Sequence, residues 1–150
     1  MQSILTPELV TLNATVVDWQ EAVCLACGLL EKHGYVENRY IEATLDAVRN
    51  LGPYIVIAPG IAVPHARPED GALKTGMSLV TLTPPIRFGS KEYDPIDLVI
   101  GLSSHDGRSH IGLLKRLCNF LLDDQNVARL RQMRDQVLVS RFINDQRWIE

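Results

Sequence analysis

One histidine stands between two prolines in residues 60–68, directly after a short apolar run. Pro64 and Pro68 fix their own φ angles and push the residues before them towards extended conformations. The backbone that bears His65 therefore has little freedom to lose when another molecule docks. From these residues alone two interpretations stay open: a histidine presented for chemistry, or a tight corner whose histidine only makes hydrogen bonds.

A second histidine, His110, falls in what the apolar spacing predicts to be the first turn of a helix. The positive end of a helix dipole disfavours a cation there and favours an incoming phosphate. The alternative is a helix-capping or loop histidine. His105 is close in sequence, but no carboxylate or third imidazole stands at convincing ligand spacing, so we predict no metal site.

The chain contains three cysteines, Cys24, Cys27 and Cys118, and a disulfide framework would need an even number in an oxidising compartment. We therefore expect reduced thiols. Cys24 and Cys27 form a CxxC pattern, but it lies within an apolar helical segment and lacks a second ligand pair. Both are predicted to be core residues, because free cysteine is among the most buried residue types.

Composition places the chain among ordinary globular proteins. With 46% hydrophobic and 22% charged residues, its 150 residues fit one domain, residues 1–150. The net charge of −3 argues against a broad nucleic-acid footprint. No apolar run is long enough for a bilayer and no secretion signal is recognisable, so we expect a cytoplasmic protein without direct membrane insertion.

Apolar spacing and turn residues predict alternating helices and strands. A capping box at Asp18 begins a helix that Gly34 ends, and Pro84-Pro85 ends a strand. The expected strands are residues 9–17, 54–57, 77–82 and 96–102, and the later helices are about 37–50, 109–122, 127–133 and 137–143. This order predicts an α/β fold: a single domain with a central mixed β-sheet and helices on both faces.

Several segments taken together resemble a known family. They are Gly-Pro-Tyr and Ala-Pro-Gly within residues 52–60, Pro-His-Ala-Arg-Pro at 64–68, Lys-Thr-Gly at 74–76, the strand at 98–102 and Ser-His-Ile at 109–111. The combination is similar to type-2 IIA components of the bacterial phosphoenolpyruvate-dependent sugar phosphotransferase system, the mannitol and fructose superfamily. The resemblance covers residues 18–133 and is strongest to the ascorbate-type and cryptic-mannitol-type branch.

The resemblance implies a phosphotransferase in uptake of a sugar or sugar acid. The carrier protein HPr would phosphorylate His65, which would pass the phosphoryl group to a cysteine of a IIB component, with no metal and no cofactor. His110 matches the second histidine of the family motif, which lies beside the phosphorylated one. The substrate stays open among ascorbate-like, mannitol-like and fructose-like compounds, in that order.

Two arginines and a set of apolar residues are further candidates. Arg49 stands where mannitol-type members have an arginine that helps with the phosphate; otherwise it is a solvated arginine at a helix end. Arg67 is a candidate for contact with phosphate or an acidic partner, or a solvated loop cation. The expected partner-binding residues are Ile61, Val63 and Ala66, with Ile86 and Phe88 as further candidates.

Two other functions compete with the carrier. IIA-like domains also occur in regulators, where phosphorylation of the same histidine changes partner binding. The third hypothesis is a generic α/β binding domain whose histidines are structural. Incorporation of phosphate at one histidine would exclude this hypothesis.

Overall fold

The computed structural model describes residues 3–146 and 148 of the chain. It contains a five-stranded sheet with the strand order β1-β4-β5-β3-β2. The pairs β1–β4 and β3–β5 are parallel, whereas β4–β5 and β2–β3 are antiparallel, so the sheet is mixed as predicted. The strands are β1 (Val10–Ala14), β2 (Val56–Ala58), β3 (Ile61–Ala62), β4 (Gly76–Ile86) and β5 (Ile96–Ser103).

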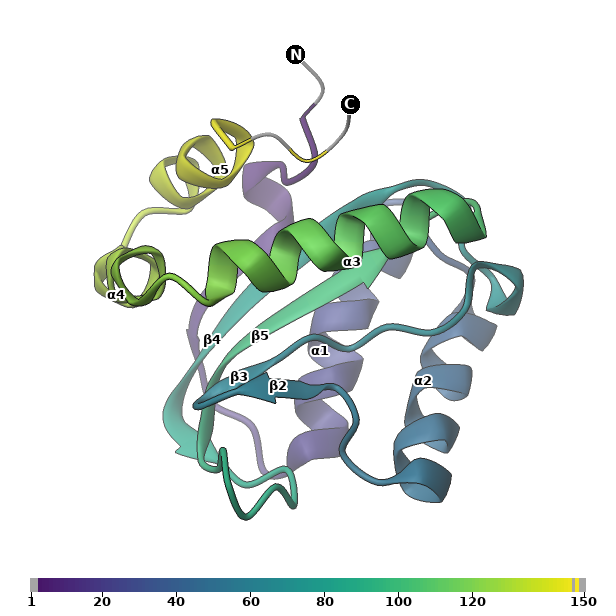
Figure 1. The fold of residues 1–150 in the computed structure, drawn as a ribbon, viewed down its shortest axis with the longest axis horizontal. Coiled ribbons are helices and arrows are strands. Elements are labelled where there is room, and N and C mark those ends of the chain that lie inside the picture. Colours follow the sequence, from purple (N-terminus) through teal and green to yellow (C-terminus); the bar gives the residue numbers. More distant parts are fainter. Residues whose placement is uncertain (1–2, 147, 149–150) are drawn as a thin grey trace.

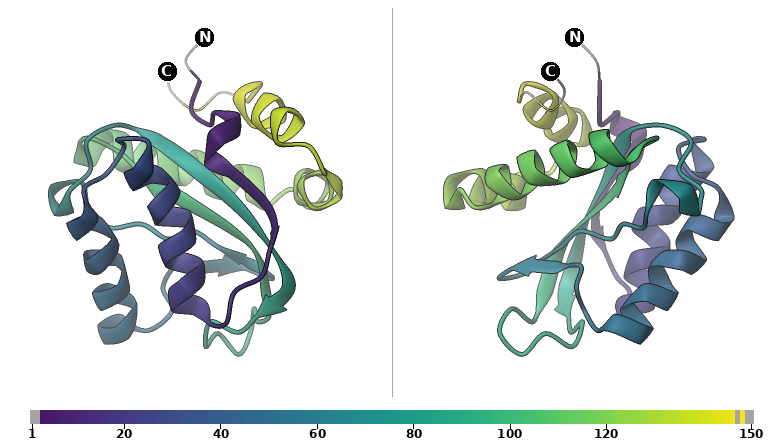
Figure 2. Two further views of the ribbon diagram at one scale, coloured as in Figure 1. Left: turned by 180° about the vertical axis from the view of Figure 1, so that it is seen from behind. Right: turned by 45° about the vertical axis from the view of Figure 1, so that its right-hand side comes forward.

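Helices cover both faces of this sheet, which confirms the predicted fold class (Figure 1). Helices α1 (Trp19–Lys32) and α2 (Asn38–Leu51) lie on one face, and α3 (Gly107–Leu121) crosses the other (Figure 2). Helix α4 (Asp124–Gln132) follows α3, and α5 (Gln136–Asn144) packs beside β1. Among the described residues, no helix is long and apolar enough to cross a membrane.

The helix boundaries follow from local capping. The Asp18 carboxylate accepts a hydrogen bond of 2.8 Å from the Glu21 N–H, so α1 begins where the sequence predicts. Gly52, with a φ of +87°, ends α2. Helix α3 begins at Gly107, two residues before the predicted start, because Asp106 caps it by accepting from the Ser109 N–H at 2.7 Å.

The two central strands are buried on both faces, as expected from their continuous apolar runs. Along β5, Leu98 and Ile100 pack in the cluster that includes α3, while Val99 packs in the cluster with α1 and α2. All three side chains are 0% exposed. Burial of each stabilises the fold by about 1.5–3 kcal/mol.

The prediction that Pro84-Pro85 ends the strand is wrong, because β4 continues to Ile86. Its pairing with β5 stops at Thr81 and resumes at Ile86, and the register shifts in between. The prolines lie in this interruption, where they need not donate a hydrogen bond to the sheet. Strand β3 was not predicted at all, since two residues give no periodic signal.

The predicted burial of the CxxC segment is confirmed for one cysteine and wrong for the other. Cys27 is 0% exposed, and burial raises the pKa of its thiol to about 12. Cys24 is exposed, because it lies off the buried stripe that Val23, Ala26, Cys27 and Leu30 form along α1.

Candidate functional site

The segment that bears His65 follows β3 and is fixed to the sheet by main-chain hydrogen bonds. The Val63 N–H donates to the Ile55 carbonyl at 2.7 Å, and the Leu102 N–H donates to the Pro64 carbonyl at 3.1 Å. These bonds place His65 where β2, β3 and the end of β5 meet. The two prolines therefore flank a residue whose backbone is already held on both sides.

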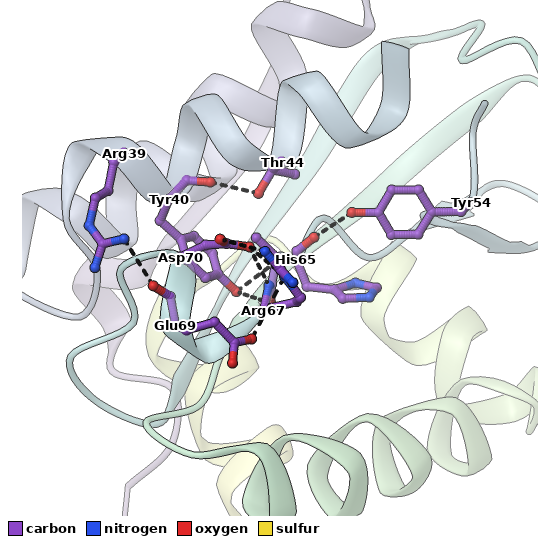
Figure 3. A network of polar contacts seen from close by, with 9 residues as sticks. Arg39, Tyr40, Thr44, Tyr54, His65, Arg67, Glu69 and Asp70 are labelled. Atoms are coloured by element: carbon purple, nitrogen blue, oxygen red, sulfur yellow. Dashed lines mark hydrogen bonds and ion pairs between the residues drawn. The ribbon is translucent and has the colours of Figure 1, made fainter. Parts of the chain in front are cut away.

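Tyr40 on α2 supplies a second attachment just after the histidine (Figure 3). Its buried hydroxyl donates to the Leu102 carbonyl at 2.6 Å and accepts from the Ala66 N–H at 3.0 Å. One side chain thus joins α2, the end of β5 and the loop after His65. Burial raises the pKa of this phenol, so it stays protonated and keeps both bonds.

The imidazole of His65 has one nitrogen engaged and one available. Nδ1 lies 2.7 Å from the carbonyl oxygen of Val63. A carbonyl can only accept, so this contact assigns the proton of the neutral ring to Nδ1 and leaves the lone pair on Nε2. The side chain is therefore prepared to act as a nucleophile through Nε2.

Two aromatic rings flank this imidazole. The Tyr54 ring lies edge-on to it, with centroids 5.3 Å apart and an interplanar angle of 83°. The His110 ring lies with its centroid 5.4 Å away, so the structure brings the two candidate histidines together. The Tyr54 hydroxyl also donates to the His65 carbonyl at 2.6 Å, as Figure 3 shows.

The surroundings of both imidazoles favour the neutral form. Burial lowers the pKa of His65, and proximity of His110 lowers it further, while the hydrogen bond to Val63 acts in the opposite direction. Burial also lowers the pKa of His110, against the attraction of the Glu69 carboxylate. A neutral imidazole retains the lone pair that nucleophilic attack requires.

The two histidines line one cavity of about 290 Å³ between α2, the His65 loop and the start of α3. Its wall is largely apolar, with one cation and one carboxylate. The lining residues are Ala43, Ala47, Leu51, Tyr54, His65, Ala66, Arg67, Asp70 and His110. Such a cavity can hold a small anionic group next to His65 while a larger molecule covers the opening.

Arg67 lies at this cavity but is already paired. Its guanidinium contacts the Asp70 carboxylate at 3.3 Å and the Glu69 carboxylate at 3.7 Å, and its side chain is 76% exposed. Arg39 on α2 donates to the Glu69 carbonyl at 2.9 Å and so ties this turn to the helix (Figure 3). An incoming phosphate would have to compete with these carboxylates for Arg67.

Arg49 is not brought to the cavity. Its guanidinium contacts Asp46 at 3.1 Å and donates to the Gln20 side chain at 3.0 Å. The α2 residues that line the cavity, Ala43, Ala47 and Leu51, are spaced by four, whereas position 49 lies between them in sequence and so points elsewhere. The structure thus gives Arg49 the role of joining α2 to the start of α1.

All three expected partner-binding residues are buried in the core. Ile61 and Val63 are 2% and 0% exposed, so their side chains cannot contact a partner, and this part of the prediction is wrong. They pack inward because β3 and the residue after it are covered on both faces. Phe88 is also buried. Ala66 is also buried, at 8% exposed, but it lines the cavity.

The exposed apolar side chains of the cavity and of the segment that bears His110 belong to other residues than the expected partner-binding ones. Leu51 and Tyr54 line the cavity and are 76% and 37% exposed, and Ile111, next to His110, is 70% exposed. Ile111 lies in the first turns of α3. It lies off the stripe of Leu113, Leu117 and Leu121, and that offset was the signal that could have identified it.

A larger hollow of about 730 Å³ lies beside the first turns of α3, lined among others by Lys74, His105 and Arg108. It includes neither His65 nor His110. His105 pairs with Asp106 at 2.9 Å, and the described residues contain no group of three side chains suited to a metal ion. The smaller cavity is the candidate site, because only there does an available imidazole nitrogen face a shaped space.

Comparison with known proteins gives matches over nearly the whole chain. Residues 3–146 match the family model described as phosphoenolpyruvate-dependent sugar phosphotransferase system, EIIA 2. The ascorbate-specific PTS system EIIA component of Escherichia coli (strain K12) is 43% identical over 129 residues, which cover 85% of this chain and 83% of that protein.

Two solved structures from Escherichia coli have the same fold. The cryptic mannitol-specific enzyme IIA aligns with a TM-score of 0.83 and 37% identity, covering 94% of this chain and 95% of that one. Mannitol enzyme IIA, in complex with phosphorylated mannitol enzyme IIB, aligns with a TM-score of 0.77 and 32% identity, covering 93% and 96%.

Proposed function

Because this chain belongs to the EIIA 2 family of the phosphoenolpyruvate-dependent sugar phosphotransferase system, and is thus a phosphotransferase component of that system, we propose that it carries the phosphoryl group on Nε2 of His65. The donor is phosphorylated HPr, and the acceptor is a cysteine of a IIB component. The observation that supports this most directly is the 2.7 Å contact of Nδ1 with the Val63 carbonyl, which leaves Nε2 as the available nucleophile.

The first transfer needs no proton to leave the attacking nitrogen. The Nε2 lone pair forms a bond to phosphorus as the bond between phosphorus and the donor imidazole breaks, and that electron pair returns to the donor ring. The positive charge that develops on the His65 ring is stabilised by the Nδ1–H···O=C bond to Val63. In the second transfer the cysteine thiolate attacks phosphorus, and the electron pair of the broken bond returns to Nε2.

Such an in-line transfer depends on positioning more than on acid-base chemistry. The fixed loop, the Tyr40 bonds and the two flanking rings supply that positioning here. Exposed apolar side chains, Leu51 and Tyr54 at the cavity and Ile111 directly after His110 in the sequence, suit a surface that two different proteins cover in turn. The mannitol enzyme IIA of the solved complex is such a case of IIA bound to IIB.

We assign the transported compound to the ascorbate-like class, on the 43% identity to an ascorbate-specific component. A IIA component handles a phosphoryl group and protein partners, so the cavity itself does not encode the sugar. Reconstitution with the cognate IIB and permease against ascorbate and mannitol tests this assignment. We place the carrier in the cytoplasm, where its phosphoryl donor would reach it.

Phosphorylation is tested with phosphoenolpyruvate, enzyme I and HPr. The wild-type protein should gain one acid-labile, base-stable phosphate by intact-mass measurement, and His65→Ala should gain none while keeping its circular dichroism. The matched control is His33→Ala, which removes a histidine at the end of α1 and should be labelled like the wild type. Undiminished labelling of His65→Ala would refute the proposal. Labelling without transfer to any IIB component would favour the regulatory alternative.

A further inference from the structure

Tyr54 contacts His65 in two independent ways. Its hydroxyl donates to the main-chain carbonyl of His65 at 2.6 Å, while its ring lies edge-on to the imidazole at a centroid distance of 5.3 Å. The first contact restrains the peptide plane after the histidine, and the second restrains the rotation of the side chain.

The position of Tyr54 follows from the sheet. Val56 pairs with Ala62 in the antiparallel β2–β3 ladder, and the Ile55 carbonyl accepts from the Val63 N–H at 2.7 Å. Continuing this pairing places residue 54 beside the residues that follow Val63. The Tyr54 backbone is itself fixed, because its N–H donates to the Gly52 carbonyl at 2.8 Å, directly after α2.

The orientation of the imidazole depends on these contacts. Nε2 is available only while Nδ1 keeps its bond to Val63, and that bond requires both a fixed loop and a fixed ring. The His65 carbonyl has Tyr54 as its hydrogen-bond donor. Without that donor the peptide after His65 gains freedom, and the distance from Nδ1 to the Val63 oxygen is no longer held.

We propose that Tyr54 is a positioning residue for phosphoryl transfer, holding the His65 main chain through its hydroxyl and the imidazole through its ring, so that Nε2 stays directed at the incoming phosphorus. This rests on the proposed function of His65. Tyr54 takes no proton and makes no bond in the reaction. Burial raises the pKa of its phenol to about 12, so the hydroxyl remains a donor throughout the physiological range.

The two contacts can be separated by substitution. Tyr54→Phe removes the hydroxyl and keeps the ring, and Tyr54→Leu removes both. The matched control is Tyr35→Phe, which removes a phenol hydroxyl at the other hollow, beside Lys74. Each protein is measured for kcat and KM in phosphorylation by phospho-HPr, and for the His65 tautomer by two-bond ¹H–¹⁵N correlation spectra of the unphosphorylated protein.

We expect Tyr54→Phe to lower kcat about 10-fold with KM for HPr unchanged, since the hydroxyl faces His65 and a small misplacement of a reacting group is costly. Its spectra should show a mixture of Nδ1–H and Nε2–H forms in place of the single Nδ1–H form. Tyr54→Leu should also raise KM, because the ring is 37% exposed at the opening. Tyr35→Phe should match the wild type in both measurements.

A Tyr54→Phe protein with the wild-type kcat would overturn this role. So would a lowered kcat with an unchanged tautomer ratio, because the hydroxyl would then act by some means other than positioning the ring. The tautomer is measured without any phosphoryl donor. A wild-type protein that accepts no phosphate would therefore refute the proposed function and leave the spectra as a separate test of Tyr54.

Discussion

The two imidazoles of the cavity differ in how their nitrogens are bonded. Nδ1 of His65 has a carbonyl partner, whereas Nδ1 of His110 is buried with no partner among the described residues. An unpaired buried acceptor is tolerated more readily than an unpaired buried N–H. We therefore expect the proton of neutral His110 on Nε2, from which it can donate to a phosphoryl group held on His65.

His110→Ala should consequently impair transfer without abolishing acceptance. The variant should still be labelled by phospho-HPr, because the nucleophile is intact. It should pass the phosphoryl group to IIB about 10- to 100-fold more slowly, as expected on loss of one positioned electrostatic group. Rapid-quench measurement of the two half-reactions checks this. If the His110→Ala variant accepts from HPr and transfers to IIB at the wild-type rates, His110 has only a structural role.

The same histidines should make stability depend on pH. Burial lowers the pKa of His65 and of His110 below their ordinary value of 6.5. Below pH 6.5 these imidazoles take up protons in the unfolded chain but stay neutral in the folded protein. Their contribution to the free energy of unfolding is therefore fully present above pH 6.5 and is lost as the pH falls towards the folded-state pKa values. From about pH 7 to about pH 5, the free energy of unfolding should fall less in a His65→Ala/His110→Ala double variant than in the wild type.

Urea titrations at each pH measure this difference. His33→Ala serves as the control, because that histidine ends α1 away from the cavity. It should keep the wild-type slope. A double variant with the same pH dependence as the wild type would show that the two buried imidazoles do not contribute to acid destabilisation.

At the scale of elements, α2 organises the site more than any other helix. Ala43, Ala47 and Leu51 form one wall of the cavity, and Tyr40, one turn earlier, joins the helix to β5 and to the His65 loop. Arg39 adds a bond to the turn that contains Glu69. A change at one position of α2 should therefore affect stability and transfer together.

Tyr40→Phe tests this connection. The substitution keeps the ring but leaves the Ala66 N–H and the Leu102 carbonyl without their short contacts to the hydroxyl. Unpaired buried polar groups cost about 1–3 kcal/mol, so we expect a loss of that size in urea unfolding. The initial rate of labelling by phospho-HPr should fall in the same variant. A loss below the error of the titration would show that other groups hold the loop.

Sequence alone predicted the elements with strong periodic or capping signals and the histidine with a restricted backbone. The start of α1 at Asp18 and the presence of five helices on two faces needed only local information. The sequence could not predict that Ile61 and Val63 are buried, because a two-residue strand has no pattern that distinguishes a buried side chain from an exposed one. The extension of β4 past Pro84 depends on where pairing with β5 is interrupted, which is tertiary information.

The same limit explains the site. His65 and His110 were found, as residues of a motif, but Tyr54 reaches His65 only through the β2–β3 pairing and Arg49 is directed away by the rotation of α2. Both facts depend on the three-dimensional arrangement of segments, which local sequence patterns do not specify. Leu51 and Ile111 had a weak signal, since each lies outside the buried stripe of its helix.

At the scale of the whole molecule, His65 lines a cavity whose wall also includes exposed apolar side chains. If the chain acts as proposed, HPr and IIB each bring a reacting atom to Nε2 of His65, so both cover this apolar surface and they should compete. Leu51 lines the cavity at the end of α2, and Ile111 follows His110 in the first turns of α3; the two side chains are 76% and 70% exposed. A charge at either position would be buried against both partners.

Leu51→Asp and Ile111→Asp should each weaken transfer from HPr and transfer to IIB, by about 10-fold or more, through desolvation of the new carboxylate and its repulsion of the phosphoryl group. The matched control is Leu122→Asp, since Leu122 is as exposed as Ile111, at 71%, but lies at the other end of α3. It should transfer normally in both directions. Chemical-shift mapping of the wild type with each partner shows whether the two binding surfaces coincide. Two disjoint surfaces would contradict a shared surface, and so would an Ile111→Asp variant in which transfer with only one partner is slowed.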